Sequence, residues 1–294
     1  MMRRGRAIVF ATALEILGEP LVLLVLVASL AVASLAPAMH YHQFGEPSRM
    51  ARDAGISALL LGGAVVACAG TARTFRREIE SGTAQAALAR SVSRTAFFLW
   101  KSLGCFVAYA VFSATVSLVS LTVVRGAEIG GAIALETGVM ARLWGPSLAL
   151  AVAAFVIPML VAAALNRFCR FRFVITANLL SLALAAAGSL YSFDASLACR
   201  LLTALALSAA PSLVLLSASA AFAVRFRSNA VSLAVSLVAA AVLPALGNYC
   251  LSDALVDGGA VPGQYFMAAI LSIVPAVAAL LMAGVHFING RDVQ

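Results

Sequence analysis

The sequence predicts an all-α fold, a polytopic bundle of transmembrane helices, and three observations point to it. Of the 294 residues, 63% are hydrophobic and only 11% are charged, whereas a soluble domain carries about 25% charged residues because water covers its surface. Long uncharged runs recur along the whole chain, and the arginines gather in short segments between them. We therefore expect an integral, multi-pass protein of the plasma (inner) membrane.

Residues 1–20 predict an amphipathic helix that lies on the membrane surface. The basic start resembles that of a signal peptide, but Glu15 and Glu19 follow a short apolar stretch, and no cleavage site precedes the next apolar run. A basic end beside an apolar stretch is typical of a helix held at the lipid headgroups. The alternative is that these residues extend the first span.

Residues 21–294 form the predicted membrane domain. Eight apolar segments approach or exceed the roughly 20 residues that a helix needs to cross the hydrocarbon core, and backbone groups in lipid favour helices over strands. The segments are 21–39, 54–72, 95–124, 143–165, 174–191, 201–224, 230–246 and 265–287. Four of them contain a proline, at Pro158, Pro211, Pro244 and Pro275.

The arginines also predict an orientation. With a cytoplasmic N-terminus and eight spans, 15 of the 20 Lys and Arg residues fall in the inner segments and 5 in the outer loops. Inner loops of membrane proteins are normally enriched in these residues. We therefore expect both termini in the cytoplasm.

Several functions are disfavoured by what the chain lacks. The single lysine, Lys101, is not preceded by the glycines of a phosphate-binding loop, so we expect no ATP hydrolysis and no cofactor in this chain. Apart from Lys101 the predicted spans carry no charge, which disfavours an ion-coupled carrier. The five cysteines show no metal-ligand spacing. A net charge of +8 is accounted for by anionic lipid and requires no nucleic acid.

The longest inner segment, residues 73–101, has the sequence RTFRREIESGTAQAALARSVSRTAFFLWK. Its pattern predicts a charged helix over 75–80, a break at Gly82 and Thr83, and a short second helix over 84–90. Ser93 is placed to cap the third span, and we expect Lys101 to anchor that span at the membrane boundary by reaching toward the headgroups. The segment is either a loop that only sets topology or a helical protrusion that docks a partner.

This segment resembles the permease subunits of type-2 ABC transporters. Between their second and third spans these proteins carry a pattern close to E-x-x-x-G-T-x-x-x-x-L-x-x-P-[VI]-S-R, with a lysine seven residues on. The chain has Ser91 where the family usually has proline, and Ala84 where leucine is common. The matching residues are Glu78, Gly82, Thr83, Leu88, Val92, Ser93, Arg94 and Lys101. A weaker likeness over 222–253 is to permeases from gene clusters for the maturation of multicopper enzymes.

The resemblance implies six core spans, a homodimer or heterodimer of permeases, and a separate ABC ATPase subunit that binds ATP and magnesium. Two of the eight predicted segments would then form an extra hairpin or re-entrant loops. The segment 73–101 would be the coupling loop seated on the ATPase, with coupling roles for Glu78, Gly82, Thr83, Ser93 and Arg94. The chain itself would be no enzyme but the permease of an ATP-driven exporter. The alternative is a membrane scaffold that anchors a soluble partner without transport.

Overall fold

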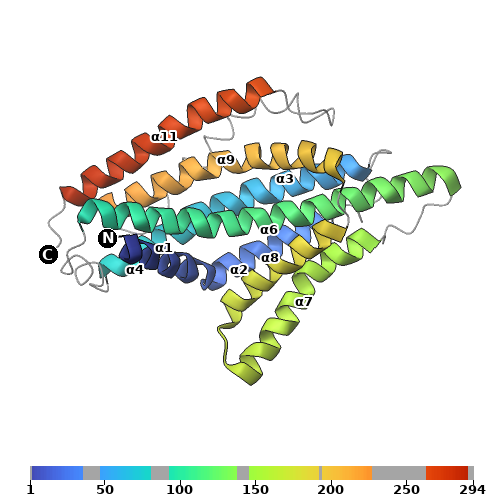
Figure 1. Ribbon diagram of the computed structural model, residues 1–294, viewed down its shortest axis with the longest axis horizontal. Helices are drawn as coiled ribbons and strands as arrows, with labels where there is room; N and C mark the ends of the chain where they lie inside the picture. Colours follow the sequence, from blue (N-terminus) through green and yellow to red (C-terminus); the bar gives the residue numbers. More distant parts are fainter. Residues whose placement is uncertain are drawn as a thin grey trace.

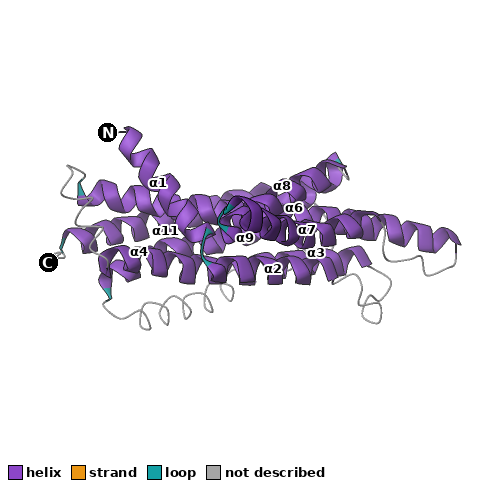
Figure 2. Ribbon diagram, turned by 90° about the horizontal axis from the view of Figure 1, so that it is seen from below, coloured by secondary structure: helices purple, strands orange, loops and turns teal. Residues whose placement is uncertain are grey.

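The computed structural model describes residues 2–35, 47–80, 93–137, 146–191, 194–226 and 263–290, and within these ranges all regular structure is helical. Most of the helices run roughly along one axis (Figures 1 and 2). Helices α1 and α6 begin, and α4, α9 and α11 end, at the same end of the bundle (Figure 1). The helices are α1 (Met2–Leu17), α2 (Pro20–Leu35), α3 (Pro47–Val65), η3 (Val66–Gly70), α4 (Thr71–Glu80), α6 (Arg94–Thr137), α7 (Pro146–Cys169), α8 (Phe173–Tyr191), α9 (Ala195–Arg225) and α11 (Gly263–Asn289).

Seven of the eight predicted segments coincide with helices, and the other, 230–246, lies outside the described residues. Five helical stretches of the described part are long and apolar enough to cross a membrane, and the pair α1–α2 is a sixth if it forms one bent span. Within α7, the residues whose side chains the structure describes make up a shorter apolar helix, Phe155–Cys169. The described part of the chain is thus all helical with five to six candidate spans, and eight spans stay a prediction.

The second predicted span does not end where its apolar run ends. Helix α3 continues through the five-residue π-helix η3 into α4, so that one helical rod runs from Pro47 to Glu80. The expected helix over 75–80 is therefore the continuation of a span rather than a separate element. A π turn accommodates an extra residue without ending a helix, and charged side chains from Arg73 onward do not by themselves break it.

Helix α6 is the longest element of the described chain, with 44 residues. At a rise of 1.5 Å per residue it is about 66 Å long, roughly twice the thickness of the hydrocarbon core. It passes along the bundle and extends beyond the other helices at one end (Figures 1 and 2). Its middle is buried, with Phe112 and Val116 among the least exposed side chains of the core.

Small side chains let the helices approach closely. A Cβ atom built on Gly62 would lie 2.3 Å from Oγ of Ser29, and one on Gly55 would lie 2.5 Å from Oγ of Ser120. Transmembrane helices commonly pack through glycine, alanine and serine because lipid offers little hydrophobic drive for helices to associate. Glycine at these two positions fixes the contacts of α3 with α2 and α6.

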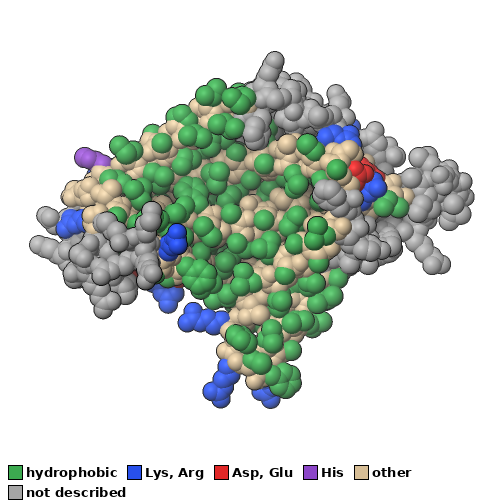
Figure 3. All heavy atoms as spheres, viewed as in Figure 1, with side chains coloured by type: hydrophobic (Ala, Val, Ile, Leu, Met, Phe, Trp, Pro, Cys, Tyr) green, Lys and Arg blue, Asp and Glu red, His purple; other side chains and the backbone are tan. Residues whose placement is uncertain are grey.

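The outer faces of the bundle are apolar. Helix α11 exposes Met267, Leu271, Val274 and Met282, and hydrophobic side chains cover most of the face shown in Figure 3. Lysine and arginine side chains gather at the ends of the bundle and at the tip of the hairpin formed by α7 and α8 (Figure 3). This distribution is typical of a protein whose sides contact lipid.

Candidate functional site

The helix α4 leads directly into the segment 81–92, which lies outside the described residues. One face of α4 is buried through Thr71, Ala72, Thr74 and Phe75, and the opposite face carries charge. The aromatic ring of Phe75 packs against that of Phe98 on α6, with ring centroids 5.4 Å apart. The two helices that border the segment 81–92 are thus held together by apolar contact.

A buried ion pair joins the same two helices. Nζ of Lys101 lies 2.6 Å from Oε2 of Glu78, and the Lys101 side chain is fully buried while that of Glu78 is 25% exposed. The lysine ammonium also lies 5.3 Å from the centroid of the Phe75 ring, within the range of a cation–π contact. A buried ammonium requires a nearby carboxylate because its removal from water is costly.

The position of Lys101 corrects one expectation. We expected its side chain to reach outward to the lipid headgroups, but it turns inward to Glu78. The reason is local: side chains of α4 and α6 meet at this height through Phe75 and Phe98, so the Glu78 carboxylate is within reach of the ammonium. Whether Lys101 marks the membrane boundary stays a prediction.

A second group of charges connects α4 to the end of α1. Arg77 Nη1 lies 3.9 Å from both Glu15 Oε1 and Glu19 Oε1, and Arg73 Nη1 lies 3.7 Å from Glu19 Oε2. Arg73 and Arg77 are one helical turn apart, as are Glu15 and Glu19, so the two pairs face each other with matching spacing. The arginines are half or more exposed, so each pair adds little stability. Their effect is to fix which face of α4 meets α1.

The chain bends sharply beside these carboxylates. Helices α1 and α2 meet at an angle of 63°, around Gly18, Glu19 and Pro20. Nδ2 of Asn178, a buried residue of α8, donates a hydrogen bond of 2.7 Å to the carbonyl oxygen of Leu17. Carbonyls at the end of a helix lack intrahelical partners, and this bond satisfies one of them. We refer to residues 17–20 as the elbow.

We define the junction as the charged residues Glu15, Glu19, Arg73, Arg77, Glu78 and Lys101 together with the elbow and Asn178. It brings α1, α2, α4, α6 and α8 together next to the segment 81–92. No group of three or more His, Cys, Asp or Glu residues that could hold a metal occurs in the part of the chain that the structure describes. The junction connects these helices through ion pairs and one hydrogen bond.

Comparison of the chain with protein-family models, curated proteins and solved structures finds no match. The function of the chain is therefore inferred from the geometry of the junction and from the sequence pattern.

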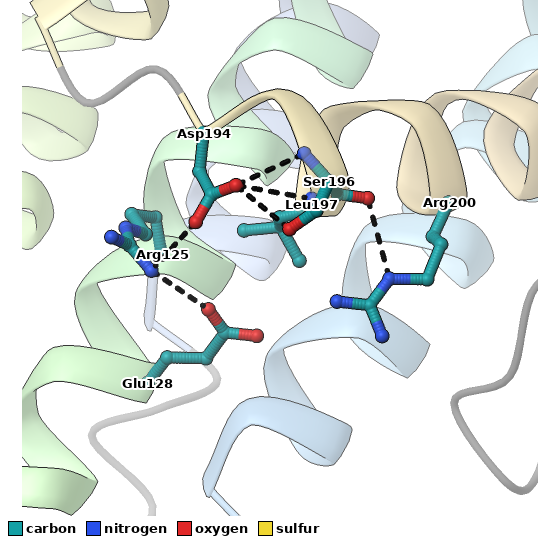
Figure 4. A network of polar contacts seen from close by, with 6 residues as sticks. All are labelled: Arg125, Glu128, Asp194, Ser196, Leu197 and Arg200. Atoms are coloured by element: carbon teal, nitrogen blue, oxygen red, sulfur yellow. Dashed lines mark hydrogen bonds and ion pairs between the residues drawn. The ribbon is translucent and has the colours of Figure 1, made fainter.

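The opposite end of the bundle has a polar network of its own. Arg125 on α6 lies 3.2 Å from Oδ2 of Asp194 and 3.4 Å from Oε2 of Glu128 (Figure 4). Asp194 caps α9, where Oδ1 accepts hydrogen bonds from the hydroxyl of Ser196 at 2.8 Å and from its amide at 3.0 Å. This network ties the far part of α6 to the start of α9.

The structure describes three of the five residues for which a coupling role is expected: Glu78, Ser93 and Arg94. Glu78 belongs to the junction, and Ser93 caps α6 as predicted, because its hydroxyl accepts a hydrogen bond of 3.2 Å from the amide of Ala96. Arg94 is the first residue of α6. Gly82 and Thr83 lie outside the described residues. The coupling role of all five stays a prediction.

Sequence reasoning gave Lys101 a different role and did not identify the remaining members of the junction. The matching four-residue spacings of the Glu15–Glu19 and Arg73–Arg77 pairs were a readable signal of a shared face. Asn178 gave no such signal, because its partner Leu17 is 161 residues away in the sequence.

Proposed function

We propose that this chain is the membrane-spanning permease subunit of an ATP-driven exporter of the type-2 ABC class. A separate ATPase subunit, which binds ATP and magnesium, docks on the coupling loop 73–101 from the cytoplasm. A second permease, identical or related, completes the transporter in the plasma (inner) membrane.

The observation that carries the proposal is the pairing of Glu78 with Lys101. Both residues belong to the sequence pattern shared with the family, and they stand at either side of the segment 81–92, with Nζ and Oε2 2.6 Å apart. A loop can pass the motion of a partner into the membrane only if its two ends are stiff and move together. Here both ends continue into long helices, one running from Pro47 to Glu80 and the other being α6.

The junction supports the same proposal. Motion of α4 is passed to the elbow through Arg73 and Arg77, and from the elbow to α8 through Asn178. A docked ATPase that shifts α4 therefore acts on several candidate spans at once. A scaffold that only anchors a partner does not require such a connection.

The first test is co-purification. A permease subunit solubilised in mild detergent brings down a P-loop ATPase, and so does the Gly82→Val variant, in which we expect the β-branched side chain to disturb the break in the coupling loop without preventing assembly. Recovery of a partner that lacks a P-loop contradicts the proposal and favours the scaffold, whereas recovery of no partner contradicts both hypotheses.

The second test measures coupling without knowledge of the substrate. A spin label on Cys199, which is exposed near the start of α9 at the far end of the bundle, reports the state of that end in the assembled transporter, with Cys169 and Cys250 replaced by serine. ATP hydrolysis changes the label spectrum in the parent protein. The change is lost in Glu78→Gln and in Gly82→Val while the ATPase continues to turn over.

The matched control is Asp53→Asn, which alters an exposed carboxylate of α3 outside the junction and outside the Arg125 network. Its label responds to ATP like that of the parent. Melting temperatures of all variants establish that the loss is not unfolding. An unchanged response in both Glu78→Gln and Gly82→Val rejects the coupling role.

A further inference from the structure

The turn between α7 and α8 alternates arginine with phenylalanine. Residues 166–173 have the sequence NRFCRFRF. The side chain of Phe168 is 84% exposed and that of Phe171 58% exposed. The three arginines of the turn, Arg167, Arg170 and Arg172, are exposed as well. In Figure 1 the two helices diverge from the rest of the bundle toward this turn, and Figure 3 shows basic side chains at its tip.

The turn has a defined shape. Arg170 adopts a left-handed conformation with φ of 57°, and its amide donates to the carbonyl oxygen of Asn166 at 3.2 Å, which is the usual way to end a helix. Nδ2 of Asn166 donates to the carbonyl oxygen of Phe171 at 2.7 Å. These bonds fix the backbone on both sides of Arg170, so the arginine and phenylalanine side chains project from a fixed base.

The three arginines of the turn have no acidic partner within the described residues. The ion pairs described for this chain lie at the junction and at Arg125, and none involves Arg167, Arg170 or Arg172. Their guanidinium groups are therefore available to a ligand, and a guanidinium binds phosphate oxygens through two parallel hydrogen bonds.

The lengths of the two helices place the turn at the edge of the hydrocarbon. Helix α7 has 24 residues and α8 has 19, which correspond to about 36 and 28 Å, close to the roughly 30 Å of the bilayer core. Along α7, Val156, Ile157 and Leu160 are exposed, as expected for a helix surrounded by lipid. A hairpin of this length is long enough to carry its turn to the level of the headgroups.

We propose that the turn 166–173 is a binding site for anionic phospholipid. The rings of Phe168 and Phe171 enter the boundary between headgroups and acyl chains, and the three arginines bind lipid phosphates. Exposed phenylalanine favours lipid over a soluble acidic partner, because two bare rings in water would be unfavourable. The proposal requires only that the chain crosses the membrane, and it is independent of the exporter assignment.

A fluorophore on Cys169 tests the proposal directly, because this cysteine is exposed in the turn itself while Cys68 and Cys105 are buried. Cys199 and Cys250 are replaced by serine. The labelled protein is reconstituted in equal parts phosphatidylcholine and phosphatidylglycerol, and either lipid is brominated in turn to quench the fluorophore. We expect brominated phosphatidylglycerol to quench more strongly, with up to about a fivefold preference for each arginine at low salt that declines as salt is added.

The test variant combines Arg167→Gln, Arg170→Gly and Arg172→Gln. Glycine suits the left-handed conformation at residue 170, so the turn is retained while its charge is removed, and the preference for phosphatidylglycerol falls to parity. The control combines Arg200→Gln and Arg225→Gln, two exposed arginines elsewhere, and keeps the preference. Equal quenching by both lipids in the parent, a preference that survives in the test variant, or quenching by aqueous iodide alone each overturns the proposal.

Discussion

Lys101 shows how an apolar helix accommodates one charge. The side chain is fully buried, yet its ammonium meets the Glu78 carboxylate at 2.6 Å and the Phe75 ring at 5.3 Å. Together these contacts offset part of the cost of removing the ammonium from water. The ion pair thus holds α4 and α6 in one register. An apolar side chain in place of Lys101 would specify this register less strictly.

Removing one partner of this pair destabilises the protein more than removing both. Lys101→Met leaves the Glu78 carboxylate without its ammonium, and we expect a loss of about 3 kcal/mol in the free energy of unfolding, at the lower end for buried pairs because Glu78 is partly exposed. The double variant Lys101→Met with Glu78→Gln recovers part of the loss. Reversible unfolding in sodium dodecyl sulfate measures both, and strictly additive losses would show that the two residues do not interact.

Asp194 predicts a pH response at the start of α9. Hydrogen bonds from the hydroxyl and amide of Ser196 and from the amide of Leu197, with the Arg125 charge, lower the pKa of Asp194 below its ordinary value of 3.8. A carboxylate with a lowered pKa contributes stability that is present above the unfolded value and is lost as the pH falls through the folded value. The first turn of α9 therefore stays formed at neutral pH and frays only in acid, below about pH 4.

Hydrogen exchange of the Ser196 and Leu197 amides, corrected for its intrinsic pH dependence, measures this fraying. Asp194→Asn keeps a side chain that can cap the helix but has no proton to gain. We expect its exchange protection to be independent of pH across the acid range. Parallel profiles for the parent and the variant would exclude titration of Asp194 as the cause.

At the scale of elements, the elbow is the place where α1 passes into α2. Pro20 has no amide hydrogen to continue the helical hydrogen bonds, and beside the 63° bend the carbonyl oxygen of Leu17 is bonded by a side chain from α8. Residues Met2–Leu17 of the expected surface helix form α1, and the place of that helix on the membrane surface stays a prediction. Asn178 bonds the last residue of α1 to α8, beside the bend between α1 and α2.

Asn178→Ala removes the hydrogen bond to Leu17, and we expect a loss of about 1–2 kcal/mol in the free energy of unfolding because the carbonyl is left buried and unpaired. Ser181→Ala on the same helix is the matched control. Ser181 is buried and its hydroxyl has no hydrogen-bond partner among the residues that the structure describes, so we expect this substitution to be neutral or slightly stabilising. Faster hydrogen exchange around residues 17–20 in Asn178→Ala alone would locate the effect at the elbow, and equal losses in both variants would refute it.

At the scale of the whole molecule, the sequence predicts elements better than the contacts between them. The apolar runs predicted the positions of seven helices, because an apolar run depends only on its own surroundings, which are lipid or packed core. The end of the apolar run at Ala72 does not mark the end of a helix. The backbone hydrogen bonds continue through η3 into α4, because no residue there interrupts them. The partners of Lys101 and Asn178 could not be predicted, since they depend on how helices distant in the sequence rotate against each other.

The length of α6 has a mechanical consequence. Its cap at Ser93 stands beside the segment 81–92, and Arg125, far along the same unbroken helix, holds the start of α9. A continuous helix resists bending, so a sideways push near Ser93 would tilt it as one rigid rod about a point near the buried ring of Phe112. For a rod of about 66 Å, a tilt of 5° about its middle carries each end by roughly 3 Å in opposite directions.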